Sequence, residues 1–285
     1  MLSAARGALV AASLIAEDDP LPPFAARMSG NLTLLVYPDA RSFYVVKVGV
    51  MLDLAREHEG LARGSEAMPG SVPRPLTLAE CEGLQVLVAT GIDHRPLDPR
   101  ARADDAELLV SGLDEFWTIG ASAPRTTQSI GAQAHDALDR LGRRVPAFDA
   151  QRYRASLEVR LPQLRAIAQH GDFALNNLGR TRDGLAIFDW EDYGRVSVAG
   201  YDLATLLLSL AGFDARRLAR ALGSDSLEAA IARRACERLG MTTTALVELL
   251  PLYLALFIEA KSSNAYGPEV AGRAIDALAS LARSR

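Results

Sequence analysis

Three polar residues with complementary chemistry lie near two short apolar runs, Leu175–Gly179 and Leu185–Phe188. The polar turn RTRDG joins the two runs, so the stretch is predicted to fold as a small β hairpin. Asp172 precedes the first run, Asn177 follows five residues later, and Asp189 comes directly after the second run. Antiparallel pairing brings the ends of such strands together, so Asn177 and Asp189 are expected to converge.

These residue types suit one kind of chemistry. A carboxylate and an amide oxygen are hard ligands of the kind that Mg²⁺ takes, with water and phosphate oxygens in its remaining positions. Asp172, one short loop away, can orient a hydroxyl nucleophile and accept its proton. A metal on phosphates, a positioned hydroxyl and charge neutralisation are the parts that phosphoryl transfer needs.

The elements before the hairpin are predicted to form a β-rich lobe. Residues 23–29, 32–38 and 43–50 are short apolar runs separated by turn residues, which indicates a three-stranded meander. A short helix over residues 52–62 and a further strand over residues 84–89 are expected next. The first residues of the chain are interpreted as a helix of the fold, with a secretory signal as the alternative.

From about residue 103 the pattern becomes helical. Helices are expected over 103–117, 151–168, the segment after an Asp225–Glu228 capping box, 244–260, and from Pro268 onward. We therefore predict an α+β architecture of two lobes. A small β-rich N-terminal lobe covers residues 1–90 and binds nucleotide, and a larger, mostly helical C-terminal lobe covers residues 91–285 and carries the catalytic and substrate groups.

Composition excludes several classes of protein. The 285 residues are 49% hydrophobic and 23% charged, as in a folded globular protein, with a net charge of −4 that provides no basic field for nucleic acid. The two cysteines, Cys81 and Cys236, are too few for a disulfide framework. The longest apolar stretches fall short of the roughly 20 residues of a membrane span. A cytoplasmic protein without nucleic-acid or membrane partners is expected, and its oligomeric state is left open.

Lysine usage is unusual. Among the 31 basic residues only Lys47 and Lys261 are lysines, and Lys47 stands inside an apolar strand. An isolated lysine in a strand more often lies on an edge strand, where its charge prevents pairing with other chains. Beside the polar set above, a phosphate ligand is the favoured interpretation.

Four motifs, in this order along the chain, resemble those of the aminoglycoside phosphotransferase and choline kinase superfamily. They are YVVKVG around Lys47, HGDFALNN around Asp172, IFDWE around Asp189 and GYDLATLL around Asp202. The resemblance implies a bilobal protein-kinase-like fold. It also implies an ATP- and Mg²⁺-dependent phosphotransferase that moves the γ-phosphoryl group to a hydroxyl.

The resemblance assigns roles to the residues that match these motifs. It implies that Asp172 is the catalytic base, that His170 braces the catalytic loop, and that Asn177 and Asp189 hold Mg²⁺. Asp202 would hydrogen-bond the catalytic loop from below.

The same resemblance implies a nucleotide site. Lys47 would contact the α- and β-phosphates, with a glutamate of the following helix as its partner: Glu57 fits best and Glu59 is the alternative. Backbone groups at Val88 and Ala89 would meet the adenine. The turn over the nucleotide offers only one glycine, Gly30, which departs from the glycine- or serine-rich family pattern and leaves GTP as an alternative nucleotide.

The acceptor is expected to be a small hydroxyl compound of aminoglycoside, amino alcohol, amino acid or sugar type. Only twelve residues separate Asp189 from Asp202, too few for the activation segment and peptide platform of a protein kinase. Glu259, Asn264 and Tyr266 are candidate substrate contacts. Two alternatives stay open: a nucleotide-binding pseudokinase with a regulatory role, and a kinase that acts on proteins.

Overall fold

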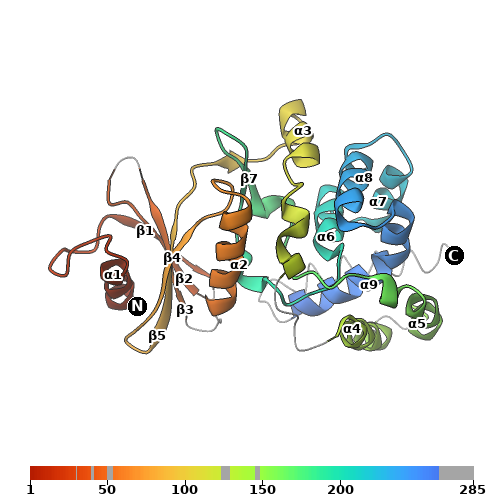
Figure 1. Ribbon diagram of the computed structural model, residues 1–285, viewed down its shortest axis with the longest axis horizontal. Coiled ribbons are helices and arrows are strands. Elements are labelled where there is room, and N and C mark those ends of the chain that lie inside the picture. Colours follow the sequence, from red (N-terminus) through yellow and green to blue (C-terminus); the bar gives the residue numbers. More distant parts are fainter. Residues whose placement is uncertain (30, 40–41, 50–53, 123–128, 145–147, 263–285) are drawn as a thin grey trace. The chain divides into compact units, whose positions relative to one another are not determined.

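The computed structural model describes residues 1–29, 31–39, 42–49, 54–122, 129–144 and 148–262. The chain forms two compact units. Unit 1 comprises Met1–Leu97 and Asn177–Tyr193, and unit 2 comprises Asp98–Asn176 and Gly194–Arg285. Unit 1 holds the β-sheets and unit 2 is mostly helical, which confirms the predicted α+β class (Figure 1). The division of functions at residue 90 stays a prediction.

An antiparallel five-stranded sheet forms the centre of unit 1, in the order β1-β2-β3-β5-β4. Its strands are β1 Phe24–Ser29, β2 Asn31–Val36, β3 Tyr44–Gly49, β4 Pro75–Cys81 and β5 Leu84–Thr90. The predicted meander and the strand at residues 84–89 are therefore confirmed. The edge strand β4 was not predicted, because its side chains are only partly buried and show no clear alternation.

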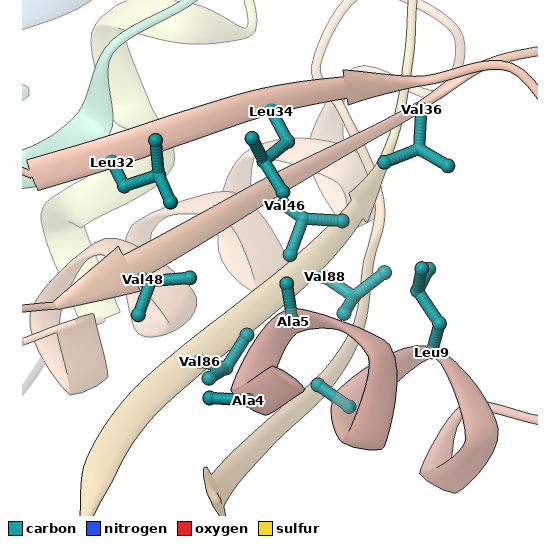
Figure 2. Packing of buried hydrophobic residues seen from close by; sticks show 11 residues of the cluster. Ala4, Ala5, Leu9, Leu32, Leu34, Val36, Val46, Val48, Val86 and Val88 are labelled. Carbon is teal, nitrogen blue, oxygen red and sulfur yellow. The ribbon is translucent and has the colours of Figure 1, made fainter. Parts of the chain in front are cut away.

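One face of this sheet is covered by α1, Leu2–Ala11. Small residues of α1, such as Ala4 and Ala5, lie against alternate residues of β3 and β5, including Val46 and Val88 (Figure 2). The eleven buried side chains of this cluster are at most 9% exposed. The N-terminal segment is thus part of the core, as expected of a helix of the fold.

The other side chains of β3 point away from this cluster, because successive residues of a strand alternate between faces. Lys47 lies between Val46 and Val48, both members of the α1 cluster, so its side chain leaves by the opposite face. There it contacts α2, Leu54–Ala67. Figure 1 shows α1 and α2 flanking the sheet. The alternation of β3 therefore buries apolar side chains on one face of the sheet and places the Lys47 ammonium on the other.

The predicted hairpin joins unit 1. It consists of β7 Leu178–Arg180 and β8 Leu185–Ile187, and the short strand β6 Arg95–Pro96 pairs with β7. The backbone N–H of Ile187 donates to the carbonyl of Ser71, which ties β8 to the segment after α2. The first strand begins three residues later than predicted, because Leu175–Asn177 forms a 3₁₀ turn.

Unit 2 contains seven described α-helices. They are α3 Ala103–Ser111, α4 Ile130–Arg144, α5 Ala150–Glu158, α6 Tyr201–Leu210, α7 Ala215–Leu222, α8 Leu227–Leu239 and α9 Thr243–Ser262. α9 packs against α4, α6 and α8. α4 and α7 were not predicted.

Several predicted helix bounds were wrong. α3 ends at Ser111, and residues Phe116–Ser122 form a separate 3₁₀ helix. α5 ends at Glu158, before a 3₁₀ turn that contains Pro162. The helix expected from the Asp225–Glu228 box begins instead with Ser226 as its cap, whose Oγ accepts from the N–H of Ala229. The helix expected from Pro268 lies outside the described residues.

Within the described part of the chain, α9 is long and apolar enough to cross a membrane by length and composition alone. Its span Thr243–Lys261 is 61% buried inside the protein. Burial against other helices explains its apolar sequence without a membrane.

Candidate functional site

Lys47 is the centre of a partly buried ion-pair cluster in unit 1. Its Nζ lies 2.7 Å from Oε1 of Glu57 on α2 and 3.2 Å from Oδ1 of Asp189 after the hairpin. The lysine side chain is 15% exposed. Burial alone would lower the pKa of Lys47, but the two carboxylates outweigh it and raise that pKa above its ordinary value. The group is therefore a fixed positive charge at every physiological pH.

The structure separates the two candidate glutamates on α2. Glu57 is buried and contacts Lys47, whereas Glu59 forms an exposed ion pair with Arg63, one turn further along the same helix. The difference follows from helix geometry, since positions two residues apart do not share a face.

Asn177 and Asp189 lie at the base of the hairpin. The backbone N–H of Phe188 donates to the carbonyl oxygen of Asn177 at 3.0 Å, so Asn177 lies opposite the residue that precedes Asp189. Asp189 adopts a left-handed backbone with φ of 63°, a conformation that non-glycine residues rarely take and that is concentrated at functional sites. Its side chain remains 42% exposed, so it can reach a ligand.

A further acid, Glu191, follows within a 3₁₀ turn, Trp190–Asp192. Burial and the neighbouring charge of Asp189 raise the pKa of Glu191 to about 7, against the opposing effect of Lys47. This hairpin end therefore concentrates negative charge around one ammonium.

In unit 2 the loop that carries Asp172 is fixed from below by Asp202. The backbone N–H of His170 donates to Oδ2 of Asp202 at 2.6 Å, and that of Gly171 donates to Oδ1 at 3.0 Å. Gln169 accepts from the N–H of Asp202, which closes a buried network. Burial raises the pKa of Asp202 to about 7, against the effect of the two N–H groups.

His170 lies inside this loop and is 1% exposed. Its Nδ1 accepts from the N–H of Asp172 at 3.3 Å, and its ring packs against Phe116 and Phe173, which stack on each other. The imidazole thus occupies a packing position, and its contact with Asp172 is through the backbone.

The structure adds a residue to which the sequence analysis assigned no role in the site. Nζ of Lys261, near the end of α9, lies 2.7 Å from Oδ1 of Asp172. Glu259, the nearby substrate candidate, instead forms an ion pair with Arg140 of α4. The rarity of lysine in this chain was the one sequence signal that singled out Lys261.

Other predicted residues have different surroundings. Val88 and Ala89 lie in the inner strand β5 and are paired with residues on both β3 and β4, so their backbone groups belong to the sheet. The side chain of Val88 belongs to the core cluster under α1. Gly30, Asn264 and Tyr266 lie outside the described residues.

The donor set at the hairpin fits a nucleotide-bound Mg²⁺ better than a metal held by protein alone. Among the described residues no group of three or more His, Cys, Asp or Glu side chains is arranged to hold a metal ion. Asp189 and Asn177 carry side-chain oxygens of the hard type, and Asp189 is 42% exposed whereas Asn177 is buried. A Mg²⁺ that takes most of its ligands from phosphates and water needs only one or two such side chains.

Solved structures share this fold across their full lengths. A choline/ethanolamine kinase family protein from Mesorhizobium loti aligns with a TM-score of 0.64 and 17% identity, covering 100% of both chains. Choline kinase LicA from Streptococcus pneumoniae has a TM-score of 0.59 and 16% identity, covering 96% of this chain and 98% of its own.

A thermostable mutant of aminoglycoside phosphotransferase APH(4)-Ia, in a ternary complex with ADP and hygromycin B, has a TM-score of 0.61 and 14% identity over 99% of this chain and 98% of that one. No curated protein sequence matches the chain. The sequence profile of the phosphotransferase enzyme family, APH, matches residues 30–238, most of the chain. With the kinase-like fold and this match in agreement, the chain belongs to the phosphotransferase enzyme family.

Proposed function

We propose that this protein is an ATP- and Mg²⁺-dependent kinase that transfers the γ-phosphoryl group to a hydroxyl of a small molecule. The observation that carries the proposal is the Lys47 ammonium, which is largely shielded from solvent and held between Glu57 and Asp189. A cation kept in place by two carboxylates costs burial energy that a structural strand residue would not require. A role in phosphate binding would account for a lysine at this position.

Unit 1 supplies the nucleotide groups in this proposal. Lys47 binds the α- and β-phosphates of ATP, and Glu57 keeps its ammonium in position. Asp189 and Asn177 hold Mg²⁺, which would neutralise phosphate charge when bound. Gly30 is the proposed contact for phosphates, and the backbone that follows β5, beyond the paired residues Val88 and Ala89, is the proposed contact for adenine.

Unit 2 supplies the group that acts on the acceptor. The acceptor hydroxyl donates its hydrogen bond to Asp172, which takes the proton as the hydroxyl oxygen bonds to the γ-phosphorus. The bond from that phosphorus to the bridging oxygen breaks, and ADP leaves with the electron pair. His170 and Asp202 act as positioning residues, because they hold the backbone of the loop on either side of Gly171.

A small acceptor is favoured by the length of the segment after Asp189. It forms one 3₁₀ turn and reaches α6 at Tyr201, with no room for a peptide-binding platform. The net charge of −4 and the burial of α9 favour a cytoplasmic enzyme without nucleic-acid or membrane partners. ATP is the proposed donor and GTP the alternative.

The test is ADP release from purified protein with MgATP and a panel of hydroxylated metabolites and antibiotics. Asp172→Ala should lower acceptor-dependent ADP release by about 10³-fold, because the general base is lost, while nucleotide binding changes little. Asp183→Ala, in the exposed turn of the hairpin, is the matched control and should behave as wild type. Wild-type transfer by Asp172→Ala would reject the assignment of the base.

A further inference from the structure

The contact between Lys261 and Asp172 places a positive charge beside the group proposed to receive the acceptor hydroxyl. The Nζ and Oδ1 atoms are 2.7 Å apart, and both residues belong to unit 2. The side chains are 12% and 23% exposed, so the pair is sheltered but can be reached by a ligand. A surface ion pair formed by chance would be more exposed, as the pair between Arg160 and Glu248 of α9 is.

Among the described residues, two other acids of this region are engaged elsewhere. Glu259, two residues before Lys261, is engaged with Arg140, and Asp202 lies under the loop on the backbone N–H groups of His170 and Gly171. An ammonium carries three donors in a compact head, so it can contact Asp172 and an anionic ligand group together. The hydroxyl that reaches Asp172 therefore arrives next to a cation.

Such a cation selects among acceptors by charge. A carboxylate or phosphate group close to the acceptor hydroxyl gains an ion pair with Lys261, whereas a primary or quaternary ammonium at that place meets a like charge. The similar proteins of known structure include kinases of choline and ethanolamine, which are cations. A cation beside Asp172 predicts the opposite preference for this chain.

We propose that Lys261 recognises the acceptor and that the acceptor is an anionic hydroxyl compound, either a hydroxy acid or a phosphorylated alcohol. The proposal rests on the proposed function, since it names the substrate class of the same reaction. Lys261 pairs with the anionic group of the acceptor while Asp172 holds the hydroxyl. In the absence of acceptor, the ammonium neutralises Asp172, as the structure shows.

The scarcity of lysine gives a direct binding test. Acetylation of the full-length protein, followed by mass spectrometry, reports Lys47 and Lys261 separately because the chain has no other lysine side chain. The probes are matched three-carbon compounds: glycerate, glycerol 1-phosphate, neutral glycerol and the cation serinol. The six-carbon set is glucuronate, glucose 1-phosphate, glucose and glucosamine.

MgATP should protect Lys47 and leave Lys261 reactive. At least one anionic probe should slow acetylation of Lys261 about threefold or more, while its neutral and cationic counterparts do not. The carboxylate and phosphate arms distinguish a hydroxy acid from a phosphorylated alcohol. Equal acetylation of Lys261 with every probe would overturn the proposal, and so would its protection by MgATP alone, which would make it a nucleotide contact.

Kinetics give the second measurement. Lys261→Glu should raise the KM for an anionic acceptor about tenfold or more and shift preference towards the cationic counterpart, whereas Lys261→Arg should keep the wild-type preference. Arg160→Gln, which removes a cation from an exposed pair with α9, is the control and should leave the preference unchanged. A structural role for Lys261 would lower stability without reversing this preference.

Different results contradict the kinase function and the anionic acceptor class. If MgATP does not protect Lys47 and no acceptor stimulates ADP release, the proposed kinase function fails. If MgATP protects Lys47 but cationic acceptors are preferred and Lys261→Glu leaves that preference unchanged, only the anionic class fails.

Discussion

The two lysines of the chain occupy contrasting environments, one in each unit. Lys47 lies inside β3, paired with Thr33 of β2 and Leu87 of β5, and its ammonium contacts two carboxylates. Lys261 lies in the last turn of a helix and contacts Asp172. The first is fixed by the backbone of a sheet and the second by one side-chain contact.

This difference separates two kinds of binding group. A cation with two anionic partners and a rigid backbone is preorganised for a ligand that every reaction cycle uses, such as nucleotide phosphate. A cation on a helix end with a long side chain can exchange its partner for a ligand anion. We therefore expect substitutions at Lys47 to weaken both protein stability and nucleotide binding. Substitutions at Lys261 are expected to change which acceptor is preferred.

The largest effect on stability is expected for Lys47→Met. The substitution leaves Glu57 buried without its cation, so the free energy of unfolding should fall by about 3 kcal/mol. MgATP should no longer raise the melting temperature. Denaturant unfolding measures the free energy of unfolding, and thermal unfolding with and without MgATP measures the change in melting temperature.

A double variant tests whether the loss of stability comes from the unpaired carboxylate of Glu57. Lys47→Met with Glu57→Gln should recover most of the lost stability, yet nucleotide should still fail to stabilise the protein. Glu59→Gln, on the same helix but in an exposed pair, should change the unfolding free energy by less than about 0.5 kcal/mol. Equal stability of the single and double variants would show that Glu57 does not depend on Lys47.

The elements that carry the Lys47 site were largely predictable from the sequence because each follows a short-range pattern, whereas the contact of Lys47 with Asp189, 142 residues away, was not. Alternation in β3 buries Val46 and Val48 and sends Lys47 to the other face. The hairpin between Asn177 and Asp189 follows from two apolar runs and a turn. The choice between Glu57 and Glu59 depends on which face of helix α2 is turned toward Lys47. The local sequence does not determine that orientation.

The Lys261 contact could not be predicted in the same way. It joins Asp172 to the far end of α9, and no periodic pattern relates positions so distant in sequence. The strand β4 was missed for a related reason, since an edge strand with partly buried side chains lacks alternation. The wrong end of α3 arose because apolar spacing continues past Gly112 into the separate 3₁₀ helix at Phe116–Ser122.

Unit 2 differs from unit 1 because its catalytic loop is held by the buried carboxyl group of Asp202 and not by an ion pair. We therefore expect the stability of the protein to depend on the protonation of Asp202. Between the ordinary pKa of 3.8 and the folded value of about 7, folded Asp202 retains a proton that the unfolded chain has released. Its contribution to stability is therefore present at low pH and is lost as the pH rises through that window. From pH 5.5 to pH 7 the loss is about 2 kcal/mol.

Asp202→Asn removes this titration. The difference in unfolding free energy between wild type and variant should therefore shift by about 2 kcal/mol towards wild type as the pH falls from 7 to 5.5. Denaturant unfolding at a series of pH values measures it. A difference that stays constant over this range would mean that Asp202 is ionised in the folded protein throughout.

The smallest predicted effect concerns how unit 1 holds Asp189. α2 packs against the 3₁₀ turn that follows this residue, and a Cβ at Gly60 would lie 2.8 Å from Cβ and Cγ of Tyr193 and 3.0 Å from Cε3 of Trp190. Overpacking by the added methyl group of Gly60→Ala should destabilise the protein by about 1–3 kcal/mol. The better helix propensity of alanine offsets about 0.5–1 kcal/mol of this loss, so the free energy of unfolding should fall by about 1 kcal/mol.

Gly7→Ala is the matched control for that substitution, because it also lies inside a helix on the sheet of unit 1. A Cβ there would meet Sγ of Cys81 at 3.5 Å, an ordinary contact, so the helix propensity of alanine should stabilise the protein by about 0.5–1 kcal/mol. If Asp189 depends on the packing of α2, Gly60→Ala should also weaken stabilisation by MgATP, whereas Gly7→Ala should not. Unchanged stabilisation by MgATP in both variants would show that the strand pairing at Asn177 is enough to place Asp189.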